Sequence, residues 1–132
     1  MPGADPGAGA SPVVRLATVC LDCADAHELA LFYGRLLGWP FAMAEADWVL
    51  LRDPAGGVAL SFQAETDFVT PVWPEEPGRP RKSMHLDLRV DDLEAASTRA
   101  VELGARVPEH QPQERVRVLL DPAGHPFCLF LD

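Results

Sequence analysis

The chain has 132 residues, enough for one domain with a buried core. Apolar residues make up 48% and the formal net charge is -9, which indicates a globular protein that repels nucleic acid and anionic membranes. No apolar run approaches the roughly 20 residues of a membrane span. The amino end lacks a basic region followed by an apolar one, so we expect no signal peptide. Three cysteines without a disulfide framework indicate reduced thiols, so we expect a cytoplasmic protein.

The first half predicts a strand, a helix and three short strands. Residues 1–12 contain mostly Pro, Gly, Ala, Ser and Asp and are expected to form a flexible tail. A strand is expected over 13–22. A helix follows Asp25, because Glu28 completes a capping box and apolar residues recur at helical spacing as far as Leu37. The three short strands are expected over 41–44, 48–52 and 58–63.

The second half begins after a long loop and repeats the same order. Residues 64–82 are rich in Pro and acidic residues and include Trp73; a loop of this length is usually a linker or a lid. Residues 83–90 then predict a strand, and a helix begins at Asp91 or Asp92. The remaining strands are expected over 105–109, 116–120 and 126–131.

Two matched strings indicate an internal repeat. Asp-Pro-Ala-Gly occurs at 53–56 and 121–124, and Leu-Gly ends both helices, at 37–38 and 103–104. A βαβββ unit present twice is the simplest account; the alternative is that Asp-Pro-Ala-Gly is only a common turn string. We expect an α+β domain with curved mixed sheets, each covered on one face by a helix, whose opposite faces form a concave ligand cavity. The two modules are then residues 13–63 and 83–132, joined by 64–82.

The strand over 83–90 carries unlike side chains on its two faces. His85, Asp87 and Arg89 alternate with apolar residues and therefore share one face. Three such groups need either water or a polar cavity. Two interpretations stay open. The row contacts a ligand, with His85 as general base or hydrogen-bond donor and Asp87 beside it, or the row is a structural polar network between the modules.

Two other patterns concern cysteine and histidine. Cys20 and Cys23 form a Cys-x-x-Cys string, but on a strand their sulfur atoms face opposite ways, so we expect no redox or zinc motif there. Cys20 by itself is expected to face the cavity. His125 lies in the second Asp-Pro-Ala-Gly turn and is expected at the surface.

Three stretches in combination resemble a known superfamily. Residues 32–39 read Phe-Tyr-Gly-Arg-Leu-Leu-Gly-Trp, residues 85–93 read His-Leu-Asp-Leu-Arg-Val-Asp-Asp-Leu, and residues 121–127 read Asp-Pro-Ala-Gly-His-Pro-Phe. The chain resembles the vicinal oxygen chelate superfamily, the glyoxalase/bleomycin-resistance/dioxygenase group, and most of all its glyoxalase-like branch, which is common in bacteria. The resemblance implies paired βαβββ modules around a cupped cavity, often in a homodimer.

Metal-dependent members of this superfamily place ligands on the first and last strands of each module. The matching positions here are Thr18, Leu60, His85 and Cys128, or Ser61 in place of Leu60 if the strand register slips by one residue. Only His85 is a usual ligand; Cys128 could bind zinc as a thiolate, but two donors do not make a tight site. We therefore expect no cofactor and no metal, with His85 and Cys128 as weak candidates.

The expected function is metal-independent binding of a small hydrophobic or aromatic molecule, such as a natural product held by a resistance or sequestration protein. The residues expected to contact it are Thr18, Cys20, Trp48, Leu60, Phe62, Trp73, His85, Asp87, Arg89, Cys128 and Phe130. The alternative is an enzyme, a glyoxalase-like lyase or isomerase or a dioxygenase, with His85 and Asp87 as catalytic residues and His85 as metal ligand or general base. A third alternative is an accessory module that acts through its dimer surface.

Overall fold

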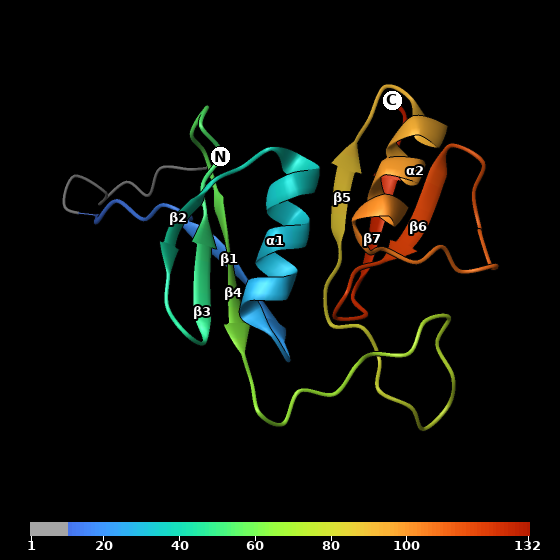
Figure 1. Ribbon diagram of the computed structural model, residues 1–132, viewed down its shortest axis with the longest axis horizontal. Helices are drawn as coiled ribbons and strands as arrows, with labels where there is room; N and C mark the ends of the chain where they lie inside the picture. Colours follow the sequence, from blue (N-terminus) through green and yellow to red (C-terminus); the bar gives the residue numbers. More distant parts are fainter. Residues whose placement is uncertain (1–10) are drawn as a thin grey trace.

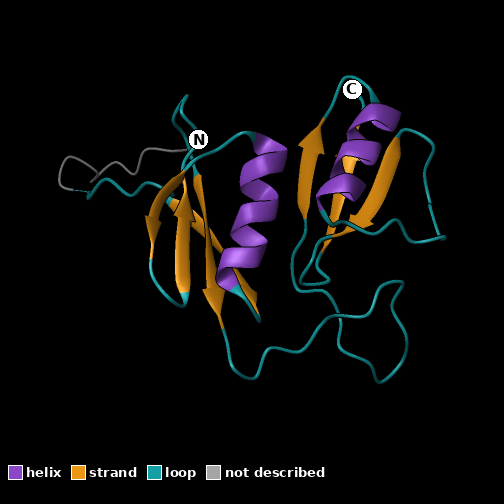
Figure 2. Ribbon diagram, viewed as in Figure 1, coloured by secondary structure: helices purple, strands orange, loops and turns teal. Residues whose placement is uncertain are grey.

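The computed structural model describes residues 11–132, so the tail predicted for residues 1–12 lies almost wholly outside the described residues. The chain forms the mixed α+β fold that its sequence predicts, with two small sheets and a helix on each (Figures 1 and 2). No helix within residues 11–132 has both the length and the apolar character needed to cross a membrane.

The first module has the predicted order of strand, helix and three strands. Its elements are β1 (Thr18–Cys23), α1 (Ala26–Leu37), β2 (Phe41–Ala44), β3 (Trp48–Leu51) and β4 (Ala59–Ala64). The strand order is β1-β4-β3-β2, with β1 parallel to β4 and the other pairs antiparallel. Asp25 caps α1 by accepting a hydrogen bond from the Glu28 backbone N–H at 3.0 Å. Gly38 ends the helix with a φ of 74°, a conformation that favours glycine.

The second module has a smaller sheet. Its elements are β5 (Leu86–Arg89), α2 (Leu93–Leu103), β6 (Val116–Leu120) and β7 (Pro126–Phe130), in the strand order β5-β7-β6. The strand predicted over 105–109 is reduced to one bridge, between Arg106 and Leu120. The amide side chain of Gln111 donates to the Val118 carbonyl and accepts from the Val118 N–H, both at 2.9 Å. A side chain therefore satisfies the edge of β6 where a further strand was expected.

The two modules share one hydrophobic core that is built around α1. Figure 1 shows α1 between the first sheet and the second module. Phe32 and Tyr33 of α1 reach both sides: the ring of Tyr33 stacks on Phe62 of β4 at 5.8 Å, and the ring of Phe32 meets Phe127 of β7 edge-on at 5.7 Å. The modules are therefore joined through the helix-covered side of the first sheet; we call the helix-free face of each sheet its open face.

Hydrogen bonds also join the modules at the second Asp-Pro-Ala-Gly turn. The Tyr33 hydroxyl donates to the buried Asp121 carboxylate at 2.7 Å. The other Asp121 oxygen accepts from the backbone N–H groups of Ala123 and His125. The ring Nε2 of His125 lies 2.6 Å from the carbonyl oxygen of Asp22 on β1. The expectation that His125 lies at the surface is therefore wrong, because this turn folds against the first module.

Candidate functional site

The open face of the second sheet carries the polar row that the sequence predicts on one side of β5. Leu86 and Leu88 pack against the core, so the alternation of the strand leaves His85, Asp87 and Arg89 on the other side. β7 runs parallel to β5 with Asp87 opposite Cys128 and Arg89 opposite Phe130. The polar row and β7 therefore contribute five side chains to this face: His85, Asp87, Arg89, Cys128 and Phe130.

Three of these side chains converge. The His85 Nε2 lies 3.3 Å from the Asp87 Oδ1, and the side chains are 41% and 59% exposed. The donor atoms of His85, Asp87 and Cys128 all lie within 4.8 Å of one another. Nearby, the Arg89 guanidinium stands 5.5 Å from the centre of the Phe130 ring. Imidazole, carboxylate, thiol and aromatic groups thus lie side by side on two hydrogen-bonded strands.

The local environment keeps the Cys128 sulfur protonated in the free protein. Partial burial raises the pKa of the Cys128 thiol, and the neighbouring Asp87 carboxylate raises it further. The Lys82 ammonium acts in the opposite direction. Cys128 is therefore a thiol at neutral pH and a poor nucleophile in the absence of a further cation.

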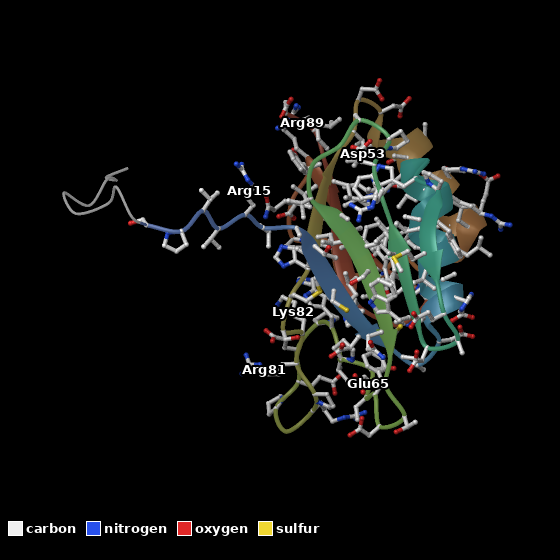
Figure 3. The ribbon with its side chains drawn as sticks, turned by 90° about the vertical axis from the view of Figure 1, so that its left-hand side faces the viewer. Arg15, Asp53, Glu65, Arg81, Lys82 and Arg89 are labelled. Carbon is white, nitrogen blue, oxygen red and sulfur yellow. The ribbon has the colours of Figure 1, made fainter. Side chains whose placement is uncertain are left out.

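Figure 3 views the first sheet from its open face, with the helices behind the sheet. Pairing places Cys20 of β1 beside Ser61 of β4, and Trp48 of β3 beside Gln63 of β4, on this face. Thr18, two residues before Cys20, lies on the same face. This face therefore offers a hydroxyl, a thiol and an indole, as the sequence predicts for these three positions.

Leu60 and Phe62 lie on the opposite face of β4 from the one expected. Leu60 pairs with Val19 and Phe62 with Leu21, and both belong to the core beneath α1. Phe62 has no exposed surface, so it cannot contact a ligand on the open face in this conformation. The polar residue between them, Ser61, is the one on the open face, and its polarity within an apolar run was the available signal.

The loop between the modules, residues 65–82, packs mainly against the second module. The Trp73 ring lies 5.6 Å from the ring of His110. The Arg81 Nε donates to the Glu75 Oε2 at 2.9 Å, and the Lys82 Nζ lies 3.7 Å from the other oxygen of the same carboxylate. A cavity of about 170 Å³ remains where this loop meets β1. Its lining includes Cys20, Asp22, Phe68, Arg81, Met84 and His125.

The positions that hold a metal in the superfamily do not form one donor set here. Thr18 offers a neutral hydroxyl and Leu60 faces the core, so the first module supplies no ligand of the usual kind. The second module supplies His85 and Cys128, with Asp87 opposite Cys128. A metal ion shared between the two modules therefore does not fit these residues.

Comparisons with known proteins agree with the fold. Residues 18–130 match the model of the family described as Glyoxalase-like domain. A structure described as a possible glyoxalase from Bacillus cereus is 16% identical, with 89% of this chain and 99% of that chain covered and a TM-score of 0.65. A glyoxalase/bleomycin resistance protein/dioxygenase family enzyme from Burkholderia phytofirmans is also 16% identical, with 89% and 98% covered and a TM-score of 0.68.

A third similar structure has a description that names a ligand class. TnmS3, an antibiotic binding protein from Streptomyces sp. CB03234, is 21% identical, with 90% of this chain and 96% of that chain covered and a TM-score of 0.58. No curated protein matches this chain. At these identities the structures establish the fold, and the family model covers nearly all of the described residues. The chain belongs to the glyoxalase-like domain family, within the vicinal oxygen chelate superfamily.

Proposed function

We propose that this chain binds a small hydrophobic or aromatic molecule on the open faces of its sheets, as a resistance or sequestration protein does, and that binding needs no metal shared between the modules. The observation that carries the proposal is the row on the second sheet, where Phe130, beside Arg89, shares one face with His85, Asp87 and Cys128. An aromatic surface with a few polar groups is the usual composition of a small-molecule site.

The open face of the first sheet has a matching composition. Trp48 supplies a large flat ring, and the exposed Cys20 supplies a thiol. The antibiotic-binding description of TnmS3 supports a natural product as the ligand class, since the two chains share this fold. A planar compound that stacks on an aromatic ring and accepts or donates one or two hydrogen bonds fits both faces.

A second copy of the chain completes the proposed site. Each helix covers only one face of its sheet (Figure 1), and a ligand bound to one open face alone would bury little of its surface. We therefore propose a homodimer in which the open face of one copy's first sheet opposes the open face of the other copy's second sheet. The ligand then lies between Trp48 of one copy and Phe130 of the other.

One observation favours a second candidate function. The Asp87 carboxylate lies 3.3 Å from the His85 Nε2, so it can orient the imidazole. An exposed imidazole held in this way is equipped for proton transfer to or from a bound substrate. The candidate activity is that of a glyoxalase-like lyase or isomerase, or of a dioxygenase, with His85 as the acid–base group.

A ligand panel with matched variants tests the binding proposal. Aromatic natural products are added to the full chain in the presence of a chelator, and the melting temperature and tryptophan fluorescence are measured. Phe130→Ala is expected to weaken binding about two- to tenfold, the worth of one aromatic contact. Phe41→Ala is the control, because Phe41 lies off the open faces, beside His27 at the edge of the first sheet. Equal binding by wild type and Phe130→Ala would contradict the proposal, as would the absence of any shift across the panel.

The same compounds separate the two candidate functions. Under the binding proposal each compound is recovered unchanged, and His85→Gln alters only its affinity. Turnover of a compound that is lost in His85→Gln would establish the enzyme instead. Size-exclusion chromatography reports whether the chain elutes as a dimer. If the site requires the second copy, ligand binding is lost on dilution as the dimer dissociates.

A further inference from the structure

We propose that the cavity between β1 and the loop of residues 65–82 binds a small, neutral, single-ring compound that carries one hydroxyl or N–H donor, such as a phenol. This is a second site, and it does not depend on the proposed function. Cys20 lines the cavity and also belongs to the open face of the first sheet. The inference rests instead on Phe68, Met84 and His125, which line the cavity and belong to neither open face.

The cavity has room for one ring. Its volume is about 170 Å³, and a cavity of about 150 Å³ accommodates one benzene molecule. Leu21 of β1, Phe68 of the loop and Met84, just before β5, give part of its lining an apolar character. Burial of an aromatic ring against such side chains is favourable. A ligand of about seven non-hydrogen atoms therefore fits this space.

The loop that covers the cavity is packed against the residues beneath it. The ring of Phe68 meets the ring of His125 edge-on at 5.5 Å. Beside them, Thr70 packs directly on Gly124, where an added Cβ would lie 2.3 Å from the Thr70 Cγ2. Both contacts join the loop to the second Asp-Pro-Ala-Gly turn and the residue that follows it. The cavity is therefore preformed, as small-molecule sites usually are.

His125 supplies a hydrogen-bond acceptor to the cavity. Its Nε2 lies 2.6 Å from the carbonyl oxygen of Asp22, and because a carbonyl only accepts, Nε2 carries a proton. In a neutral imidazole Nδ1 is then an acceptor. Within residues 11–132 Nδ1 has no hydrogen-bond partner, yet no buried side-chain nitrogen or oxygen there lacks one, so Nδ1 is accessible. His125 is only 7% exposed, and the cavity is the space that it borders.

The charges around the cavity favour a neutral ligand over an anion. Asp22 lines the cavity, and its carboxylate would repel a second negative charge. Arg81 also lines it, but its Nε donates to the Glu75 carboxylate at 2.9 Å, which offsets its charge. A hydroxyl or N–H group that donates to the His125 Nδ1 needs no ionic partner. A phenol meets both requirements, since it has one ring and one neutral donor.

Phenol and toluene are matched probes, because they have the same size and a methyl group replaces the hydroxyl. The full chain, labelled with ¹³C at the methionine methyl groups, is titrated with each probe and followed by NMR. Met84 lines the cavity, whereas Met43 of β2 is 52% exposed and serves as the internal reference. Met84→Leu identifies the Met84 resonance. Phenol is expected to shift this resonance saturably, with a Kd of about 1 mM, and toluene should bind about two- to tenfold more weakly.

Two variants separate the polar from the apolar contribution. His125→Gln retains an amide N–H that can donate to the Asp22 carbonyl but removes Nδ1, so phenol should lose its advantage over toluene. Phe68→Ala should weaken the binding of both probes by about two- to tenfold. Phe41→Ala is the matched aromatic control at the edge of the first sheet and should leave both affinities unchanged. Circular dichroism checks that each variant is folded.

Several results would overturn the inference. The absence of a saturable shift at Met84 would do so, as would an equal shift at Met43. Equal affinity for phenol and toluene in the wild type, or undiminished affinity in Phe68→Ala, would also contradict it. Loss of phenol binding in Phe130→Ala would assign the probe to the open face of the second sheet instead. The proposed function is tested with natural products and Phe130→Ala, so either proposal can fail without the other.

Discussion

Removing the hydroxyl of Tyr33 tests how the two modules are held together. In Tyr33→Phe the ring remains in the core, but one oxygen of Asp121 loses its 2.7 Å hydrogen bond. Asp121 is 1% exposed, so water cannot readily replace the lost donor. Leaving a buried acceptor without its partner costs about 1–3 kcal/mol. The other Asp121 oxygen keeps its two backbone donors, which favours local rather than global disruption.

The expected change is large enough to measure by thermal unfolding. An unfolding entropy of about 2.1 cal/mol/K per residue, over the 132 residues of the chain, converts about 1–3 kcal/mol into a fall in Tm of about 4–11 °C. Thr98→Val on the exposed side of α2 is the control and should shift stability by less than about 0.5 kcal/mol. A Tyr33→Phe variant as stable as the wild type would refute the reasoning that this bond joins the modules.

Three further predictions concern buried or constrained positions. Burial raises the pKa of Asp121, so the contribution of this group to stability is greatest at low pH and is lost as the pH rises through the raised pKa. Asp121→Asn should therefore lose more stability relative to wild type near pH 4 than near pH 7, as measured by urea unfolding. Burial raises the pKa of Cys23 to about 12, so native-state alkylation followed by mass spectrometry should label Cys20 and spare Cys23 until the chain unfolds. Gly124→Ala and Gly57→Ala both place a side chain at positive φ, but only Gly124→Ala brings a Cβ to 2.3 Å from the side chain of Thr70, in the loop between the modules. Gly124→Ala should therefore lower the free energy of unfolding by about 1–3 kcal/mol more than Gly57→Ala. Equal losses at the two glycines would contradict that contact.

Local patterns predicted most of the fold. The capping pair at Asp25 and the apolar stripe that follows it define α1 without tertiary information, because both act within a few residues. The alternation over 83–90 likewise placed His85 and Asp87 on one face. These features depend on neighbours in the sequence, so the sequence was sufficient for them.

The failures involve partners that are distant in the sequence. The face of Leu60 depends on its pairing with β1, some forty positions earlier in the chain. The first four residues of β4 are all buried, so the strand lacks a clear alternation that would indicate which face Leu60 occupies. Residues 105–109 were expected to form a strand, but only the bridge between Arg106 and Leu120 forms, and the side chain of Gln111 bonds to Val118 of β6. His125 is buried because its turn meets β1 of the other module. Periodicity alone contains none of this information.

The candidate site likewise combines residues that the sequence identified with a contact that only strand pairing creates. Sequence reasoning identified His85 and Cys128 from the family pattern and placed Asp87 on the face of His85. It did not bring Asp87 opposite Cys128, because that contact depends on the register between β5 and β7. Register depends on which apolar residues of both strands face the core together, which no single segment encodes.

A crystal structure of the chain with a compound selected from the ligand panel tests the central claim most directly. The account predicts the compound on the open face of the second sheet, against Phe130 and beside His85, with the first sheet of a second copy across from it. A compound bound on the helix side, or bound elsewhere while His85 and Phe130 face bulk solvent, would contradict the account.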